Sequence, residues 1–323
     1  MSDTVWVIAG GTGFLGHAIL KNHRDPDLKI IVLTRNELPA TRREARPFEN
    51  VSYVHWDAAT PGDWMRALEG ATAVINLVGR SVNCRYTEQN KAEIVASRVN
   101  ATRVLGYAIE RSARPPKVWI NIASAAIFGD TAAEQKDETS DVGEGFSAEV
   151  CKRWEAAFYE IPTPYTRKVL LRLGLVFQRN DGLLKPFSRM ARLGLAGKMG
   201  SGEQYISWIH EDDFARLVAT AVSNDDWKDV INGVSPHPVT NKDFLKSLRL
   251  AYGMRWGLPQ PAFMLKIGAL LIGTEAELLL SGRRVVSKVL EEKKFRFNYP
   301  LLDDALAQLI KIPPPSSPHR RIL

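Results

Sequence analysis

The chain has 323 residues, 45% of them hydrophobic and 24% charged, so it is long enough for one large or two closely packed globular domains. Lys and Arg outnumber Asp and Glu by 43 to 36, but the excess is scattered and forms no basic stripe with aromatic residues, so we expect no nucleic-acid partner. The two cysteines, Cys84 and Cys151, have no paired spacing, which argues against a disulfide framework or a metal site and favours a reducing, cytoplasmic location.

The first half of the chain alternates short β-rich runs with helical patterns. The expected strands cover residues 4–10, 29–35, 51–57, 73–79, 117–124 and 167–177. Their continuous apolar character is typical of strands that are covered on both faces of a parallel sheet. Since helical patterns lie between them, we predict a doubly wound α/β domain of the Rossmann type. The first strand starts almost at once, so we expect no signal peptide.

After about Phe177 the alternation ends, and the sequence becomes mostly helical. We therefore predict a Rossmann domain and a second, smaller, mostly helical domain. The Rossmann domain is expected to cover residues 1–176, with 203–233 returning to it, and the smaller domain residues 177–202 and 234–312.

Two further segments in the second half bear on location. The most apolar run, 261–273, is interrupted by Lys266 and is too short to span a bilayer, so we expect a buried helix and no membrane association. The tail 313–323 contains Pro, Ser and basic residues and is expected to be a mobile segment.

The first strand is followed by AGGTGFLGH, in which three glycines at intervals of three residues open the first helix. Glycine permits a tight turn and lets backbone N–H groups approach a pyrophosphate, and the helix N-terminus adds partial positive charge. We therefore predict a dinucleotide whose diphosphate lies over this turn. The predicted contacts are Gly10, Thr12, Gly13, Phe14, Leu15 and Gly16.

The end of the second strand indicates which dinucleotide binds. An NAD site usually has Asp or Glu there to hold the ribose 2′-hydroxyl, whereas this strand ends in Thr34 and Arg35. A guanidinium fork suits a 2′-phosphate, so we predict NADP. Arg42 and Arg43 either add to the positive field or form a solvated loop.

The ends of the third and fourth strands complete the predicted cofactor site. Asp57 follows the third strand, where it can accept a hydrogen bond from the adenine amino group or serve as a surface acid. The fourth strand ends in Leu77, Val78 and Gly79, and these residues let the chain run close to the adenosine.

Several motifs together carry a family resemblance. Besides the glycine turn, they are VINLVG (74–79), SRVNATR (97–103), SAAIFGD (124–130), EVCKRWE (149–155), GSGEQYISWIHEDD (200–213) and the C-terminal run 276–300. They resemble those of the atypical extended short-chain dehydrogenase/reductases, and more closely the YfcH-like nucleotide-sugar epimerase family with its C-terminal domain of unknown function. The resemblance covers nearly the whole chain and implies an NADP-binding Rossmann domain with a smaller substrate domain.

The reaction centre departs from the pattern that the resemblance implies. In such enzymes a Ser or Thr beyond the fifth strand orients the substrate, and a Tyr with a Lys four residues later handles the proton. Ser124, preceded by Ala123, matches the serine, although its hydroxyl can equally satisfy backbone groups of its loop. Ser147 and Cys151 occupy the places of the Tyr and the Lys. Cys151 is either a reactive thiol or a small buried cysteine.

The segment that leaves the fourth strand, GRSVNCRYTEQ, offers a different set of polar groups. It starts at the carboxyl edge of the sheet, where ligands of such folds bind. Arg80, Arg85 and Tyr86 can form an anion clamp with a phenol that serves as proton donor. The alternative is an ordinary polar loop that leads into a helix.

The second half adds candidates for substrate contacts. The resemblance implies that Trp208 and His210 border the substrate pocket, although His210 can also be a hydrogen-bonded structural residue. Asp212 or Asp213 is expected to be the N-cap of the helix that follows. The pair RR at 283–284 either meets an acidic substrate group or caps the preceding helix.

Two functions are consistent with these features. The leading hypothesis is an NADP(H)-binding protein with oxidoreductase or epimerase-like activity on a small molecule, which can be nucleotide-linked. The alternative is a catalytically silent NADPH-binding protein whose partner responds to cofactor occupancy. Ser124 and the substrate domain favour the enzyme, and the missing Tyr/Lys pair favours the alternative. No metal is expected, and the substrate and the oligomeric state stay open.

Overall fold

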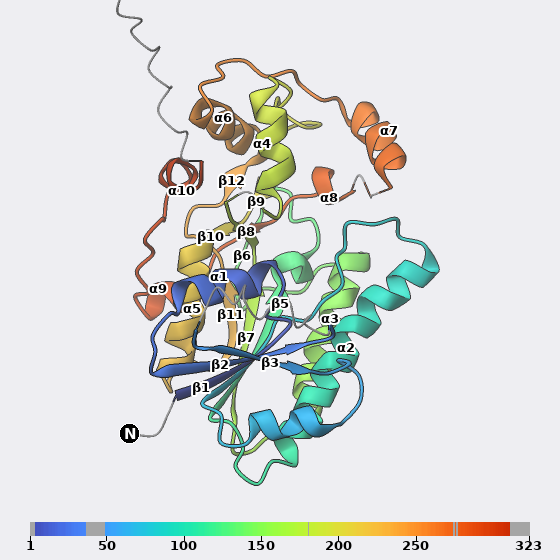
Figure 1. Cartoon of the computed structure of the whole chain (residues 1–323). Coiled ribbons are helices and arrows are strands. Elements are labelled where there is room, and N and C mark those ends of the chain that lie inside the picture. The colour runs from blue at the N-terminus through green and yellow to red at the C-terminus, as the bar shows by residue number, and fades with distance from the viewer. Residues whose placement is uncertain (1–3, 37–48, 180, 274, 276, 311–323) are drawn as a thin grey trace, which may run out of the picture.

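The computed structural model describes residues 4–36, 49–179, 181–273, 275 and 277–310. A sheet flanked by helices forms the larger part, and a smaller helical part lies beyond its edge (Figure 1). Arg42 and Arg43, as well as the expected tail 313–323, lie outside the described residues.

A seven-stranded parallel sheet has the strand order β11-β7-β5-β4-β1-β2-β3. The order reverses next to β1, which has β4 on one side and β2 on the other, and such a switch point is where doubly wound sheets bind ligands. The strands are β1 (Thr4–Ala9), β2 (Leu28–Thr34), β3 (Val51–His55), β4 (Ala73–Asn76), β5 (Val118–Ser124), β7 (Arg167–Leu173) and β11 (Asp229–Gly233).

The predicted doubly wound sheet is confirmed, with two differences in its strands. The expected strand 167–177 divides at Gly174 into β7 and β8 (Leu175–Phe177), and β8 pairs with β10 (Trp208–His210) outside the large sheet. A Cβ on Gly174 would lie 2.5 Å from the carbonyl oxygen of Ser207, so the chain crosses another backbone closely there. The seventh strand, β11, has the sequence DVING, which is too short and polar to show a strand pattern.

Helices cover both faces of the sheet (Figure 1), with α1 and α5 on one side and α2 and α3 on the other. Adjacent strand residues serve opposite cores: Ile8 packs in the α1–α5 layer, and Val7 in the α2–α3 layer, as a pleated strand requires. The bounds are α1 (Phe14–Asn22), η2 (Asp63–Leu68), α2 (Glu88–Glu110), η3 (Ala125–Phe128), α3 (Phe146–Glu160) and α5 (Glu211–Ser223).

The smaller part has its own hydrophobic core. Phe177 stacks between Trp208 and Phe244, with ring centroids 5.6 and 5.2 Å apart. The limits of the two domains stay a prediction. The remaining elements are β6 (Gln135–Lys136), α4 (Leu184–Arg192), β9 (Tyr205–Ile206), β12 (Val239–Thr240), α6 (Asn241–Ala251), α7 (Ala262–Ile272), α8 (Glu277–Leu280), β13 (Arg284–Val285), α9 (Lys288–Glu292) and α10 (Leu302–Leu309).

Helix α7 is not the buried helix that its apolar sequence predicted. Leu265 is buried, but Phe263, Met264 and Ile267 are 64%, 49% and 54% exposed. The helix lies at the periphery of the smaller part (Figure 1), and an apolar run alone does not specify what covers it. In the described ranges, no helix is both long and apolar enough to cross a membrane.

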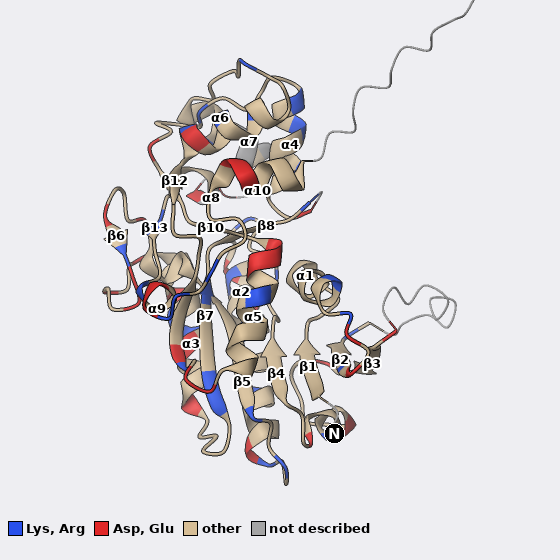
Figure 2. Cartoon of the chain, turned by 90° about the vertical axis from the view of Figure 1, so that its left-hand side faces the viewer, with Lys and Arg blue, Asp and Glu red and all other residues tan. Residues whose placement is uncertain are grey.

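Charged residues of both signs are interspersed along the ribbon in the view of Figure 2. Many belong to local pairs, such as Arg153 with Glu149 and Lys242 with Glu203. The absence of a nucleic-acid partner stays a prediction.

Candidate functional site

The glycine turn joins β1 to α1 at the carboxyl edge of the sheet. Gly10 has a φ of +77°, and a Cβ there would lie 3.3 Å from the backbone of Leu77 and Val78. A Cβ on Gly16 would lie 2.2 Å from the carbonyl oxygen of Gly11. Glycine is therefore required at both positions, because the turn packs closely against α1 and the end of β4.

Helix α1 begins at Phe14 with Gly13 as its N-cap, and no side chain caps it. Thr12 and Gly13 are exposed, whereas Phe14 and Leu15 pack partly on the core. The first N–H groups of a helix have no intrahelical partner and favour a bound anion. The turn thus offers backbone donors in the arrangement that a diphosphate needs.

The end of β2 contributes the residues that were predicted to contact the ribose and its 2′-phosphate. Thr34 is buried, and its hydroxyl accepts a hydrogen bond from the backbone N–H of Asn36 at 3.3 Å. Arg35 is exposed just beyond the strand. Gly10 N–H donates to Leu33 O at 3.1 Å, so the glycine turn and the end of β2 are adjacent.

Asp57 lies two residues beyond β3 and is exposed. Its carboxylate accepts hydrogen bonds from the Thr60 hydroxyl and from the N–H groups of Thr60 and Ala59. These bonds, the Thr60 hydroxyl first, lower the pKa of Asp57 to about 2. Asp57 therefore organises its own loop, and its contact with adenine stays a prediction.

Ser124 ends β5 and is the N-cap of η3. Its hydroxyl accepts a hydrogen bond from the N–H of Ala126 at 3.2 Å, and the side chain is half-buried after the buried Ala123. The loop-satisfying role is thus present. A hydroxyl that accepts one bond can still donate its proton, so a substrate contact is compatible with this position.

Helix α3 carries Ser147 and, one turn later, Cys151. Cys151 is 3% exposed and packs against Ile127 and Phe128 beyond the end of β5. Burial, reinforced by the Glu155 carboxylate, raises the pKa of the Cys151 thiol to about 12. A thiol with this pKa stays protonated at neutral pH, which favours the small buried cysteine over the reactive thiol.

A buried ion pair holds α3 against the sheet one turn after Cys151. Arg172 of β7 donates from Nε and Nη2 to the two carboxylate oxygens of Glu155, both at 2.8 Å. Both residues are under 9% exposed. Removing one partner of such a pair leaves a buried charge without compensation, so this contact fixes the position of α3.

The two arginines of the β4–α2 loop, which were predicted to hold the substrate, contact the chain itself. Arg80 pairs with Glu93 and donates to Asn90 Oδ1 at 2.8 Å. Arg85 is exposed and donates to the carbonyl oxygen of Leu270 at 3.2 Å. Their contact with substrate stays a prediction.

Tyr86 of the same loop points toward α3. Its ring meets Phe146 edge-on at 4.8 Å, and its N–H donates to Glu275 Oε1 at 2.9 Å. The hydroxyl is buried beside the Ser147 hydroxyl, close enough for that group to act on its pKa but without the alignment of a full hydrogen bond. Burial outweighs Ser147 and, with nearby carboxylates, raises the pKa of Tyr86, so its phenol stays protonated at neutral pH.

Arg98 of α2 was not singled out from the sequence. A Cβ on Gly79 would lie 3.2 Å from its guanidinium carbon, and the guanidinium lies over the Trp154 ring at 5.1 Å. Its charge acts on the Cys151 thiol and the Tyr86 hydroxyl. The motif SRVNATR contains Arg98 but does not show its role, because only the packing of α2 against α3 brings it to this place.

Trp208 and His210 are fully buried. Trp208 Nε1 donates to the carbonyl oxygen of His237 at 3.1 Å, and His210 Nε2 is 3.0 Å from Gln308 Oε1. His210 is thus hydrogen-bonded within the protein, and contact of either residue with substrate stays a prediction.

The start of α5 also differs from the expectation. His210 itself is the N-cap, and its Nδ1 accepts a hydrogen bond from the N–H of Asp212 at 3.0 Å. Asp213 is fully buried and accepts instead from the N–H groups of Asn298 and Tyr299 at 2.7 and 2.9 Å. The acid thus fastens a distant segment rather than its own helix.

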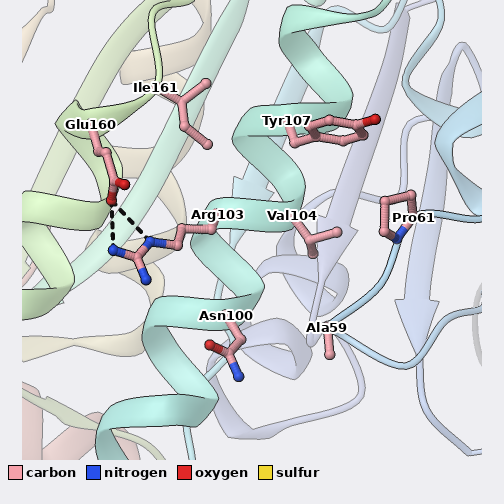
Figure 3. A pocket seen from close by; sticks show the side chains of 8 residues that line it. All are labelled: Ala59, Pro61, Asn100, Arg103, Val104, Tyr107, Glu160 and Ile161. Atoms are coloured by element: carbon pink, nitrogen blue, oxygen red, sulfur yellow. Dashed lines mark hydrogen bonds and ion pairs between the residues drawn. The ribbon is translucent and has the colours of Figure 1, made fainter.

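A hollow of about 380 Å³ lies on the outer face of α2 (Figure 3). Arg103 and Glu160 form an ion pair across it at 2.8 Å. It contains no residue of the glycine turn and neither Tyr86 nor Ser147, so we do not assign the cofactor to it. Within the described residues, no group of three or more His, Cys, Asp or Glu side chains is arranged to hold a metal ion.

Comparisons with known proteins agree with this arrangement. Residues 6–232 match the NAD dependent epimerase/dehydratase family, and residues 260–309 match a domain of unknown function (DUF1731). The chloroplastic epimerase family protein SDR39U1 homolog of Arabidopsis thaliana is 31% identical over 307 residues, which cover 94% of this chain and 86% of that protein.

Two solved structures show the same fold. Human epimerase family protein SDR39U1 (isoform 2), crystallised with NADPH, has a TM-score of 0.82 at 28% identity, covering 95% of this chain and 99% of that one. UDP-N-acetylglucosamine 4-epimerase from Bacillus cereus has a TM-score of 0.74 at 16% identity over 95% and 98% of the two chains, and shows the fold alone. With the family match over most of its length and a sheet of Rossmann order, the chain belongs to the NAD dependent epimerase/dehydratase family.

Proposed function

We propose that this protein binds NADPH and carries out hydride transfer on a small-molecule carbonyl or alcohol, as an oxidoreductase or epimerase-like enzyme. The observation that carries the proposal is the uncapped glycine turn at the switch point of the sheet. It is supported by the NADPH in the crystal structure of human SDR39U1, which is similar over nearly the full length of both chains.

The residues around the turn fit the parts of this cofactor. The N–H groups of Phe14 and Leu15 at the start of α1 would hold the diphosphate, and the exposed Arg35 would pair with the 2′-phosphate. Leu77 and Val78, which lie against Gly10, would border the adenosine. A Cβ on Gly16 would overlap the backbone of Gly11, so this glycine lets α1 pack closely on the turn.

NADPH, when bound, supplies a hydride to a carbonyl carbon. The chain must then provide a proton for the carbonyl oxygen, and Ser147 cannot, since an alkyl hydroxyl is a much weaker acid than a phenol. We assign this role to Tyr86, whose hydroxyl lies beside Ser147 and is protonated at neutral pH. Ser124 would orient the same oxygen by donating its hydroxyl proton.

The cofactor assignment is tested by substituting Arg35. Arg35→Ala should weaken NADPH binding by about tenfold to a hundredfold, which is the usual range for a lost charge-assisted hydrogen bond, and should leave NADH binding nearly unchanged. Calorimetric titration of both cofactors measures this ratio. Equal losses for the two would contradict the 2′-phosphate contact.

Gly13→Asp provides the matched control for binding at the turn. Gly13 has extended backbone angles, φ −84° and ψ 179°, so an Asp can occupy the N-cap and the protein should fold. Its carboxylate would stand where the diphosphate lies and should abolish binding of both cofactors. Unchanged NADPH affinity with a native circular dichroism spectrum would show that the cofactor binds elsewhere.

A catalytically silent NADPH-binding protein is the second candidate. It is favoured by the inert Cys151 and the Ser147 that replace the Lys and the Tyr. Incubation with NADPH and a broad metabolite extract separates the two. Cofactor oxidation that is absent in both Gly13→Asp and Tyr86→Phe supports the enzyme, whereas tight NADPH binding without any oxidation supports the silent protein.

A further inference from the structure

Two guanidinium groups from different parts of the chain lie near enough to the Cys151 thiol and the Tyr86 hydroxyl to interact with them electrostatically. Arg98 comes from α2 of the sheet domain, and Arg283 precedes β13 of the C-terminal region. The charges of both act on the Cys151 thiol and on the Tyr86 hydroxyl. Val285, two residues after Arg283, packs in the same hydrophobic cluster as Cys151.

Neither guanidinium is neutralised by a close carboxylate. Among the described residues, no ion pair within 4.0 Å is formed by Arg98 or Arg283, and Asp130 and Glu277 act on Arg283 only from a greater distance. The one hydrogen bond from the Arg98 guanidinium within the described part runs from Nη1 to Ile94 O at 2.9 Å.

The hydrogen-bonding capacity of these groups is also largely unused. A guanidinium carries five N–H donors, and the buried Nε of Arg283 has no partner among the described residues. Both side chains are half-buried, and burial disfavours their charged form. Arg172 nearby differs, because its Nε and Nη2 donate to the two carboxylate oxygens of Glu155.

We propose that Arg98 and Arg283 form an anion subsite beside Tyr86, and that the substrate carries a carboxylate or phosphate next to the carbonyl or alcohol carbon that reacts. The inference rests on the proposed function, because it takes the Tyr86 hydroxyl as the group that faces the reacting oxygen. It goes beyond that function by naming the chemical class of the substrate.

The arrangement explains why two positive charges lie where a lysine is missing. A lysine at position 151 would place one ammonium group by the cofactor, whereas the two guanidinium forks offer bidentate sites for a carboxylate or phosphate. With the anion held there, the Tyr86 hydroxyl donates its proton to the substrate oxygen while the hydride from NADPH reaches the carbon. The products are an alcohol, NADP⁺ and a phenolate that water reprotonates.

The test compares anionic compounds with uncharged analogues on the NADPH-saturated protein. The carboxylate arm uses pyruvate and its methyl ester, and the phosphate arm uses dihydroxyacetone phosphate and dihydroxyacetone. Calorimetry at low ionic strength should show that the acid binds at least tenfold more tightly than its neutral partner in one of the two comparisons. That comparison shows whether the subsite prefers a carboxylate or a phosphate.

Substitutions then test whether Arg98 and Arg283 cause the tighter binding of the acid. Arg98→Gln and Arg283→Gln should each weaken binding of the acid by about tenfold to a hundredfold and leave the neutral partner unaffected. Arg103→Gln and Arg284→Gln are the matched controls and should change neither. Arg103 pairs with Glu160 on the surface, and the Arg284 guanidinium lies over Tyr205 at 5.1 Å.

The wild-type comparison alone can overturn the proposal, even if a substituted protein fails to fold. Equal affinity for acid and neutral partner in both arms, or no binding of either acid at millimolar concentration, would refute the subsite. Acid binding that survives both arginine substitutions would refute the assignment to these residues. NADPH binding that stays intact in those experiments leaves the proposed function standing, whereas its loss in wild type contradicts that function first.

Discussion

At positions 147 and 151 the chain holds a serine and a cysteine that cannot exchange protons near neutral pH. A phenol and a positive charge come from elsewhere in the fold: Tyr86 from the β4–α2 loop and Arg98 from α2. A hydroxyl and a positive charge are thus still found by α3, although neither belongs to it. The reactivity of Cys151 can therefore be predicted from its own surroundings.

The buried thiol gives the first prediction at this scale. With its pKa raised to about 12, only about one Cys151 in 10⁴ is a thiolate at pH 8. In the native protein, iodoacetamide should therefore modify Cys84 and leave Cys151 intact, which peptide mass spectrometry can measure.

In urea-unfolded protein both cysteines should react, which is the control for accessibility of the reagent. Cys151→Ser should keep NADPH affinity, since the thiol itself contacts protein and not cofactor in this arrangement. Modification of Cys151 at the rate of Cys84 in the native state would mean that the thiol is ionised and that our account of its environment fails.

The elements around the site are joined by a buried polar network. Asn76 of β4 donates from Nδ2 to Asn121 Oδ1 at 2.7 Å and to Thr102 Oγ1 at 3.1 Å. Trp154 of α3 donates from Nε1 to the same Thr102 hydroxyl at 3.0 Å. Asn76 Oδ1 also accepts from the N–H of Val78, where the adenosine is expected. The network therefore ties two strands and two helices to the cofactor side of the sheet.

Thr102→Val tests this network with little change in shape. It leaves the indole N–H of Trp154 and one amide proton of Asn76 without an acceptor in a buried place, so the free energy of unfolding should fall by about 2–3 kcal/mol. Urea denaturation measures the change.

Thr163→Val is the matched control. Thr163 is also buried, but its hydroxyl has no hydrogen-bond partner among the described residues, so its removal should leave the stability unchanged or slightly higher. If both variants lost the same stability, the loss would reflect the valine side chain and not the network.

The sheet was predictable from sequence to the extent that its strands carry their own signal. The apolar runs and the glycine turn fix β1 to β5 and the switch point, whereas DVING in β11 becomes a strand only because β7 offers it an edge. The cofactor turn was predictable because its chemistry is local. Arg98 was not, since its position depends on helix packing. The full burial of Trp208 and His210 was not either, because a motif does not show what covers it.

At the scale of the whole molecule, the start of α5 joins the sheet domain to the C-terminal region. Asp213 accepts hydrogen bonds from the backbone of Asn298 and Tyr299, and His210 contacts the Tyr299 ring at 4.0 Å and Gln308 of α10. These contacts set the position of the segment that follows Arg283 along the chain. The proposed anion subsite, which takes one arginine from each region, therefore depends on this junction.

The junction should make stability depend on pH. Burial lowers the pKa of His210 below its ordinary value of 6.5 and outweighs the nearby carboxylates, and burial likewise lowers the pKa of His23. The unfolded chain therefore takes up protons at a higher pH than the folded protein does. The stability contributed by the neutral imidazoles is fully present above about pH 6.5 and is lost as the pH falls through 6.5 toward the folded-state pKa values.

His210→Asn isolates the contribution of the junction, since Asn can cap α5 but does not titrate. Urea unfolding between about pH 8 and pH 5 should show a falling free energy of unfolding in the wild type and a shallower fall in the variant, with His23 accounting for the rest. Protonation would also turn His210 Nδ1 from the acceptor of the Asp212 N–H into a donor that faces it. Loss of the helix cap and burial of a positive charge would therefore both lower the free energy of unfolding as the pH falls. Identical pH profiles for the two proteins would mean that His210 is free to protonate in the folded state and that the two parts of the molecule are not held together there.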